Sequence, residues 1–286
     1  MSTGTLYLVG TPIGNLEDIT ARALRILREV AVVAAEDTRQ SLKLLRHFEI
    51  QTQLVSYHEH NQRTAGPALI ERLQAGDSVA LVTDAGMPAI SDPGEDLVRL
   101  ALAAGVPVIP IPGPTAFVSA LVVSGLPTVR FAFDGFLPTK KKEREAALAR
   151  LATEERTVML YEAPHRVLET LADLDRVLGA RPMAAARELT KLHEEVVRGT
   201  PADLLAHFEA KAPRGEFVLV IGGAPYVEPE MEGWTPEGLK VAVDALVETG
   251  LRPNDAMKQV AERFGLTKRD VYQTLLDVRN KEGLSD

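Results

Sequence analysis

The chain has 286 residues, with 32 basic and 40 acidic side chains and a formal net charge of −8. Hydrophobic residues make up 45% and charged residues 25%, which is ordinary for a globular protein and excludes wholesale disorder. The absence of cysteine excludes disulfides, thiolate nucleophiles and cysteine-ligated metal sites. No apolar run approaches the roughly 18–20 residues of a membrane span, and the first residues lack a leader pattern, so we expect a cytoplasmic protein with no membrane partner.

Short apolar runs alternate with segments of helical periodicity over the first 225 residues. The segment from Thr20 to Glu29, for example, carries Ala23, Leu24, Ile26 and Leu27 at helical spacing. The predicted strands are 6–9, 31–35, 79–83, 106–109, 157–161, 183–187 and 217–221. Continuous apolar strands separated by helices are typical of a mostly parallel sheet covered on both faces, so the predicted fold class is α/β.

Two segments divide the chain. Residues 108–114 are dense in proline, which cannot continue a central strand or a helix, so this segment predicts a crossover between domains, followed by a helix over 115–124. Residues 222–236 are rich in Gly, Pro and Glu and predict a linker. We therefore expect an N-terminal α/β domain over 1–112, a second α/β domain over 113–225, and a C-terminal domain over 231–286.

The C-terminal segment has a purely helical pattern. Helices are predicted over 236–248, 254–264 and 267–280, with a short Gly265-Leu266 turn before the last one. Thr267 is a natural N-cap with Asp270 three residues further on, and Lys268 and Arg269 open the helix. The order predicts a small all-helical domain resembling a helix-turn-helix, which serves in DNA recognition but is also a common packing unit.

Five clusters of glycine, proline or charged residues stand where predicted strands end. They are Gly10–Gly14, Thr83–Gly94, Pro112–Ala116, Tyr161–Arg166 and Ala186–Glu195. Open α/β sheets bind ligands at the carboxyl ends of their strands. Any single cluster is compatible with a solvated loop, but their recurrence at one structural position indicates a ligand site.

Two further clusters suggest contacts with a metal or with phosphate. Tyr57–Asn61 includes His58 and His60, but no third ligand stands nearby, so we expect a polar loop and no metal. Net acidity disfavours indiscriminate nucleic-acid binding, and on such a chain a local basic run is the best candidate phosphate clamp; the alternative is a solvated helix start. The run consists of Lys140, Lys141, Lys142 and Arg144.

Together these clusters resemble the tetrapyrrole methylase superfamily, and within it the ribosomal RNA small subunit methyltransferase I family. The resemblance covers nearly the whole chain and rests on these motifs: VGTPIGNLEDIT (Val9–Thr20), AAEDTR (Ala34–Arg39), YHEHN (Tyr57–Asn61), VTDAGMPAISDPG (Val82–Gly94), PGPTAFVSAL (Pro112–Leu121), FDGFLP (Phe133–Pro138), YEAPHR (Tyr161–Arg166) and ARELTKLHEE (Ala186–Glu195). It implies two α/β domains that bind S-adenosylmethionine between them, commonly in a homodimer. The implied reaction is methylation of the ribose 2′-OH of a cytidine in the decoding region of 16S rRNA, within the small ribosomal subunit.

The resemblance also implies roles for individual residues. The implied cofactor contacts are Pro12, Asp84, Ala85, Met87, Thr115, Ala116, Glu162 and Ala186. An alcohol acceptor needs a general base, for which the candidates are Glu36, Asp37, Glu59, Glu188 and His193; we take Glu36, Asp37 and Glu188 forward. The candidate RNA contacts are Arg39, Lys140, Lys141, Lys142, Arg144, Arg187, Lys268 and Arg269.

Two other functions stay open on sequence grounds. The first is methylation of a tetrapyrrole or of diphthamide within the same superfamily; many tetrapyrrole-modifying relatives read G-x-G-P-G-D in the first turn, whereas this chain has Gly14-Asn15. The second is a DNA-binding regulator that uses the C-terminal helices. The lysine run and the appended helical domain favour an RNA substrate over a small molecule, and the net acidity argues against the regulator.

Overall fold

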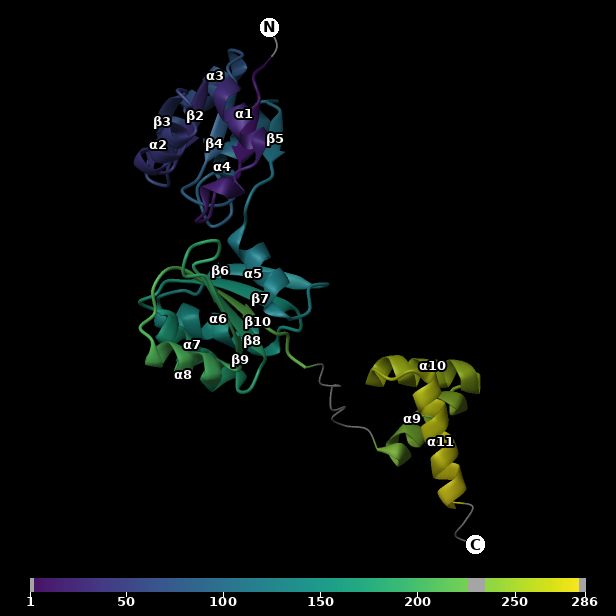
Figure 1. The fold of residues 1–286 in the computed structure, drawn as a ribbon. Helices are drawn as coiled ribbons and strands as arrows, with labels where there is room; N and C mark the ends of the chain where they lie inside the picture. The colour runs from purple at the N-terminus through teal and green to yellow at the C-terminus, as the bar shows by residue number, and fades with distance from the viewer. Residues whose placement is uncertain (1–2, 226–234, 283–286) are drawn as a thin grey trace. The chain divides into compact units, whose positions relative to one another are not determined.

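The structure is a computed structural model that describes residues 3–225 and 235–282. It contains two compact units, Met1–Pro225 and Tyr226–Asp286 (Figure 1). Most of the predicted linker over 222–236 lies outside the described residues.

The first sheet of the larger unit is entirely parallel, in the order β3-β2-β4-β1-β5. Its strands are β1 (Leu6–Val9), β2 (Val32–Ala35), β3 (Gln53–Ser56), β4 (Val79–Val82) and β5 (Val108–Ile111). The helices between them are α1 (Ala21–Glu29), α2 (Thr38–His47), α3 (Gln62–Gln74) and α4 (Glu95–Ala103), with a short 3-10 turn at Leu16–Asp18. Helices α1 and α2 cover one face of this sheet, whereas α3 and α4 cover the other.

The second sheet is mixed, in the order β6-β7-β10-β8-β9. Its strands are β6 (Phe131–Phe136), β7 (Thr157–Glu162), β8 (Met183–Arg187), β9 (Glu195–Gly199) and β10 (Phe217–Ile221). The helices around it are α5 (Ala116–Ser124), α6 (Lys141–Thr153), α7 (Val167–Leu178) and α8 (Pro201–Ala210). Helix α5 packs on one face, and α6, α7 and α8 pack on the other (Figure 1).

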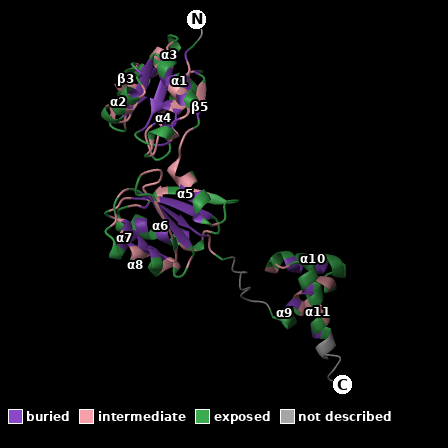
Figure 2. Cartoon of the chain, viewed as in Figure 1, coloured by how far each residue is buried: buried purple, intermediate pink, exposed green. Residues whose placement is uncertain are grey.

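The predicted strands and their flanking helices account for most of this architecture. Strands β2, β4, β8 and β10 are buried along their whole length (Figure 2), as continuous apolar runs covered on both faces should be. The α/β class is confirmed. The crossover predicted at residue 112 falls between β5, the last strand of the first sheet, and α5, which packs on the second sheet.

Two features of the fold differ from the sequence prediction. The second sheet is not mostly parallel: β6 and β7 are parallel, but β7-β10, β10-β8 and β8-β9 are antiparallel. The proline-rich segment also continues β5, where Pro110 pairs in register with Leu8. Because β5 is an edge strand, the missing N–H of Pro110 is tolerated there.

The smaller unit holds α9 (Pro236–Glu248), α10 (Pro253–Phe264) and α11 (Lys268–Glu282) around a core that includes Leu239, Val260 and Val271. Thr267 caps α11 as predicted: the Asp270 N–H donates to its hydroxyl at 3.2 Å, and its own N–H donates to the Asp270 carboxylate at 3.0 Å. Across both units, no described helix is long and apolar enough to cross a membrane.

Candidate functional site

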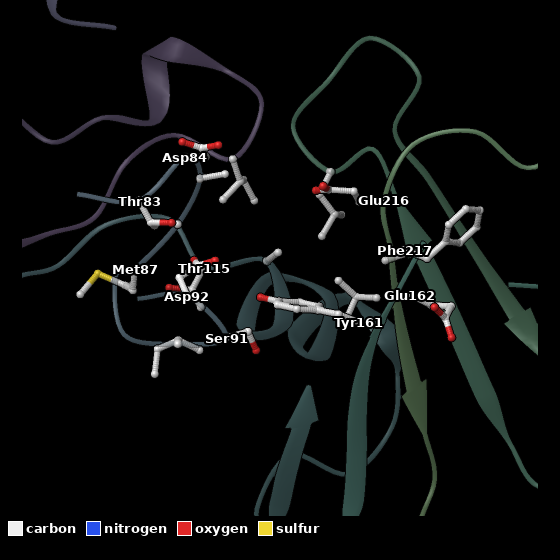
Figure 3. Close-up of a pocket in the computed structure, with 18 of the residues that line it drawn as sticks. Thr83, Asp84, Met87, Ser91, Asp92, Thr115, Tyr161, Glu162, Glu216 and Phe217 are labelled. Atoms are coloured by element: carbon white, nitrogen blue, oxygen red, sulfur yellow. The ribbon is translucent and has the colours of Figure 1, made fainter. Parts of the chain in front are cut away.

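A cavity of about 340 Å³ lies between the loops that follow β1, β2 and β4 and the strands and loops of the second sheet (Figure 3). The residues that line it from the first sheet and α5 are Ile13, Glu36, Thr83, Asp84, Ala85, Gly86, Met87, Ile90, Ser91, Asp92, Thr115 and Ala116. Those from the second sheet and its loops are Phe136, Tyr161, Glu162, Ala163, Ala186, Glu188, Leu189, Lys191, Glu216, Phe217 and Val218. Its size suits a small organic ligand.

The loops after β1 and β4 are joined by backbone hydrogen bonds. Thr11 and Gly86 exchange N–H···O bonds of 2.9 and 3.0 Å, and the Thr11 hydroxyl donates to the Thr83 carbonyl at 3.1 Å. A Cβ on Gly10 would lie 2.7 Å from the Cα of Gly113, so only glycine lets the first turn pass this close to the segment that leads into α5. The site is therefore built on a fixed backbone frame.

Left-handed backbone concentrates at this cavity. Among the described non-glycine residues, a positive φ occurs at Ala89, Ser91, Glu188, Thr190 and Glu49, and only Glu49 lies outside the two loops that border the cavity. Such conformations cost about 1–3 kcal/mol each and persist where surrounding structure enforces them, often at functional sites. The strain marks both loops as functional elements.

Two acidic residues from the first sheet are held in fixed positions. The Thr83 hydroxyl donates to the Glu36 carboxylate at 2.7 Å, and the backbone N–H of Asp37 donates to the Asp84 carboxylate at 3.2 Å. Burial raises the pKa of Asp84, and the neighbouring negative charges of Glu36 and Asp37 add to the rise.

Asp92 is a further acidic group that the sequence analysis did not single out. Burial raises its pKa from 3.8 to about 6, with contributions from the charges of Glu36, Asp84 and Glu216. The only sequence signal for it was its place in the loop Thr83–Gly94, which holds two acids among glycines and prolines.

The second sheet contributes an aromatic wall. The Tyr161 ring packs edge-on against Phe133 at 4.8 Å between centroids, and Phe133 stacks on Phe117 at 4.4 Å. The hydroxyl end of Tyr161 points toward the side of the cavity that carries Asp92 and Thr115 (Figure 3). Burial raises the pKa of Tyr161, so its hydroxyl stays protonated at neutral pH.

Of the eight predicted cofactor contacts, all but Pro12 line the cavity. Glu162 nevertheless directs its carboxylate into the protein: it is 1% exposed, accepts from the Thr170 hydroxyl at 2.6 Å and from the Ala163 N–H at 2.9 Å, and lies 3.6 Å from Arg166. The Glu162 carboxylate thus stabilises the wall of the cavity through bonds on its protein side, and does not face the ligand space.

Two predicted RNA contacts are buried. Arg144 is 8% exposed and donates to Asp173 at 2.7 Å and to Thr170 at 2.9 Å. Arg187 is 6% exposed and forms an ion pair of 2.5 Å with Glu195. The prediction that Arg144 and Arg187 contact RNA is therefore wrong. Both guanidinium groups are buried and bonded to other side chains of the protein, so neither is exposed to bind a phosphate.

The other predicted catalytic and RNA residues fall into three groups. Asp37 caps α2 and pairs with the exposed Arg39 at 2.7 Å; the hydrogen bond from that side chain lowers the pKa of Asp37 to about 2, which makes it a weak base. Glu188 lines the cavity but pairs with Lys191 at 2.8 Å. The remaining candidates are exposed on the surface: Lys140, Lys141, Lys142, Lys268 and Arg269.

His58 and His60 lie with ring centroids 5.8 Å apart. In the described part of the chain, no group of three or more His, Cys, Asp or Glu side chains is arranged to hold a metal ion.

The charged side chains that line the cavity are mostly acidic. Among the residues that the structure describes, Lys191 is the only basic side chain in the lining, and it is paired with Glu188. Glu36, Asp84, Asp92 and Glu216 add further acidic groups. A polyphosphate would be repelled by this lining, while a cationic ligand would be attracted. The cavity therefore fits a small, positively charged molecule.

The comparisons with known proteins agree with this fold and cavity. A family model of the Tetrapyrrole (Corrin/Porphyrin) Methylases matches residues 5–205. The solved uroporphyrin-III-C-methyltransferase of Thermus thermophilus is 25% identical, with a TM-score of 0.55 over 77% of this chain and 94% of that chain. Fold and site thus define a methyltransferase.

Curated relatives narrow the class. The ribosomal RNA small subunit methyltransferase I of Halalkalibacterium halodurans is 51% identical over 94% of this chain and 93% of its own length. That of Synechocystis is 49% identical over 96% of this chain and 98% of its own length. The chain belongs to the tetrapyrrole methylase family and, within it, to the ribosomal RNA small subunit methyltransferase I family, which confirms the resemblance found in the sequence.

S-adenosylmethionine is the methyl donor of this family, and the cavity passes a test of fit for it. The donor carries a sulfonium and an ammonium, and the lining offers the carboxylates of Glu36, Asp84 and Asp92 to these positive groups. The apolar side chains of Met87, Ile90 and Val218 suit the parts of the cofactor that carry no charge.

Proposed function

We propose that the protein transfers a methyl group from S-adenosylmethionine to the ribose 2′-OH of a cytidine in the decoding region of 16S rRNA, within the small ribosomal subunit. The observation that carries the proposal is the near-full-length similarity to methyltransferases named for small-subunit rRNA. The 270 residues aligned with the first of these relatives necessarily include most of the C-terminal unit, which the methylase family model over 5–205 does not reach. The relatives named for small-subunit rRNA therefore share the C-terminal helical unit.

The chemistry needs few groups from the protein. When bound, S-adenosylmethionine supplies an electrophilic methyl group on sulfur, ready for in-line displacement. The carboxylates of the cavity hold that cation in place, and the protein aligns donor and acceptor while excluding water. Because an alcohol is a weak nucleophile at neutral pH, a carboxylate of the site accepts its proton, for which Glu36 and Glu188 are available along the cavity wall.

The lysine run supports a contact with RNA phosphates. Lys140, Lys141 and Lys142 are exposed at the N-terminus of α6, and only Lys140 has an ion-pair partner in the described structure, Glu143 at 3.3 Å. Cations at a helix N-terminus oppose its dipole by about 0.3–1 kcal/mol each at exposed sites. A bound phosphate would remove this conflict, because it attracts both the lysines and the free N–H groups of the first turn. Arg39, Lys268 and Arg269 are the other exposed candidates.

An apolar surface around α5 supports the homodimer. Val118, Val122 and Val123 on α5, together with Val129 and Phe131, are between 40% and 93% exposed. A helix that is apolar on all sides is normally buried. A second copy of the chain would cover this surface. An rRNA substrate would also favour a cytoplasmic location.

Methylation of a tetrapyrrole is the alternative within the same family. The near-full-length similarity to enzymes named for small-subunit rRNA favours rRNA as the acceptor. The direct test offers both acceptors to the purified protein with methyl-labelled S-adenosylmethionine: small ribosomal subunits from cells without the gene, and uroporphyrinogen III. We expect label in 16S rRNA alone; label in the tetrapyrrole and none in rRNA would overturn the proposal.

A further inference from the structure

We infer that Lys191 binds the carboxylate at the methionyl end of the cofactor, and thereby selects S-adenosylmethionine over adenosyl sulfonium cations that lack a carboxylate. The inference concerns the cofactor, so it does not depend on which acceptor the protein methylates. Lys191 was not among the cofactor contacts expected from the sequence; the structure brings it into the lining of the cavity.

The cofactor carries charges of both signs. Its sulfonium and its α-ammonium are positive, whereas its α-carboxylate is negative. The carboxylates of Glu36, Asp84 and Asp92 attract the two cations, but they repel a further carboxylate, and a carboxylate that leaves water without a partner is costly. Because the ammonium and the carboxylate of the cofactor share one carbon atom, a site for this end of the molecule needs a base as well as acids.

Lys191 is the base that the cavity offers to this carboxylate. It is the only basic side chain among the described residues of the lining. Arg39, Arg166 and Arg187 stand close in the sequence to lining residues, but none of them lines the cavity, and each is paired with an acidic residue of its own. The one negative group of the cofactor is therefore matched by one positive side chain.

The aliphatic part of the Lys191 side chain packs against the loop after β1. A Cβ on Gly14 would lie 2.5 Å from the Lys191 Cγ and 2.9 Å from its Cε, so the lack of a side chain at Gly14 makes room for the lysine. The Leu189 carbonyl oxygen would lie 3.0 Å from the same Cβ, so the backbone of the lysine's own loop is also close to this glycine. The contact restricts where the ammonium of Lys191 can lie.

The loop that carries Lys191 is strained and bonded within itself. Glu188 and Thr190 have φ values of 49° and 66°. The backbone N–H of Lys191 donates to the Glu188 carbonyl at 3.0 Å, and the N–H of Thr190 donates to the Glu194 carboxylate at 2.6 Å. This strain is explained if the loop must present one charged group at a defined point of the cavity wall.

The ammonium of Lys191 can bind a second carboxylate besides that of Glu188. It donates to the Glu188 carboxylate at 2.8 Å, and the described part of the chain gives it no other ion-pair partner. An ammonium has three N–H donors, so two of them remain for a ligand. The Glu188 carboxylate is itself fixed, because a Cβ on Gly215 would overlap it. The Lys191 side chain is 36% exposed, which leaves its end accessible to a ligand.

The test titrates the full-length protein in a calorimeter with S-adenosylmethionine and with decarboxylated S-adenosylmethionine. Lys191→Met keeps an unbranched stem against Gly14 but removes the charge, and Lys43→Met, at an exposed lysine on α2 outside the cavity, is the matched control. We expect Lys191→Met to bind S-adenosylmethionine about 10-fold or more weakly, as for the loss of a charge-assisted hydrogen bond. Its affinity for the decarboxylated form should fall by less than about threefold or should rise, because that ligand offers no carboxylate and is repelled by an ammonium. Lys43→Met should change neither affinity.

Two results would overturn the role of Lys191. An equal loss of affinity for both ligands would mean that Lys191 only shapes the cavity wall, and an unchanged affinity for S-adenosylmethionine would mean that other groups hold its carboxylate. Lys191→Arg provides a second variant, which keeps the charge and should keep most of the wild-type ratio of the two affinities. A ratio for Lys191→Arg as low as that of Lys191→Met would also contradict the inference. Circular dichroism of each variant without ligand verifies that it is folded.

Discussion

Replacing Asp92, a half-buried acid of the cofactor cavity, with asparagine should make the protein more stable at neutral pH. A carboxylate whose pKa is raised in the folded state binds its proton more tightly there than in the unfolded chain. The stability this provides is complete below the unfolded pKa of 3.8 and is lost as the pH rises through about 6. At pH 7 to 8 the folded protein must therefore hold a half-buried charge that the asparagine variant lacks.

The size of the effect follows from the pKa shift. A rise from 3.8 to about 6 is about two pKa units, and each unit corresponds to about 1.4 kcal/mol. Because Asp92 is only half-buried, screening by solvent reduces this total, and we expect a gain of about 1–2 kcal/mol for Asp92→Asn at pH 8. At pH 4, where both side chains are uncharged, the difference should nearly vanish.

Urea unfolding followed by circular dichroism at pH 4 and pH 8 measures this difference. The full chain is used, and the change between variants reports on residues 1–225, the unit that contains the substitution. Asp134→Asn, which replaces an exposed acid on β6 outside the cofactor cavity, serves as the matched control. An Asp92→Asn protein that is no more stable than wild type at pH 8, or whose gain in stability is the same at both pH values, would refute the effect of the half-buried charge.

Three further predictions concern the cofactor, the RNA and the core. Asp84→Ala should weaken binding of S-adenosylmethionine by about 10- to 150-fold in calorimetric titration, as expected for the loss of one charge-assisted hydrogen bond. Asp77→Ala, which lies before the other end of β4 and outside the cavity, is the control and should have no effect. If Asp84→Ala binds the cofactor as tightly as wild type, Asp84 does not belong to the site. Replacing Lys140, Lys141 and Lys142 with alanine should weaken binding to the small subunit. It should also reduce the slope of log binding constant against log salt concentration by about 0.7–0.9 per lost phosphate contact, whereas Lys43→Ala on α2 should change neither. An unaltered slope would mean that the lysine run is a solvated helix start. Arg144→Ala should leave the salt slope unchanged but lower the free energy of unfolding by about 1.5–3 kcal/mol, because the charged hydrogen bonds to Asp173 and Thr170 are lost while Asp173 keeps Arg176. Exposed Arg150→Ala is the control, and a wild-type midpoint for Arg144→Ala would contradict the buried pair.

The sequence predicted the interior of both sheets but not their edges. Strands β2, β4, β8 and β10 are apolar on both faces and were predicted within a residue or two. The strands missed are β3, β6 and β9, and the proline strand β5 was misread; all four lie at sheet edges. An edge strand buries less of its surface and tolerates polar residues, glycine and proline, so it carries a weak periodic signal.

For the site, the sequence predicted which residues come together but not the direction of their side chains. Motifs at strand ends correctly brought Asp84, Met87, Thr115 and Ala186 to one cavity, because parallel strands direct their carboxyl ends to a common edge. Side-chain direction was not predictable. Arg144 finds Asp173 29 residues further along the chain, and this pairing depends on how α6 packs against α7.

Methylation of a cytidine ribose in rRNA is tested most directly by locating the methyl group that the protein transfers. Small subunits from cells without the gene are incubated with the purified protein and isotopically labelled S-adenosylmethionine, and the 16S rRNA is digested to nucleosides and analysed by mass spectrometry. We predict labelled 2′-O-methylcytidine, confined to one oligonucleotide of the decoding region. Label on a nucleobase, on a ribose other than that of cytidine, or on no nucleoside at all would contradict it.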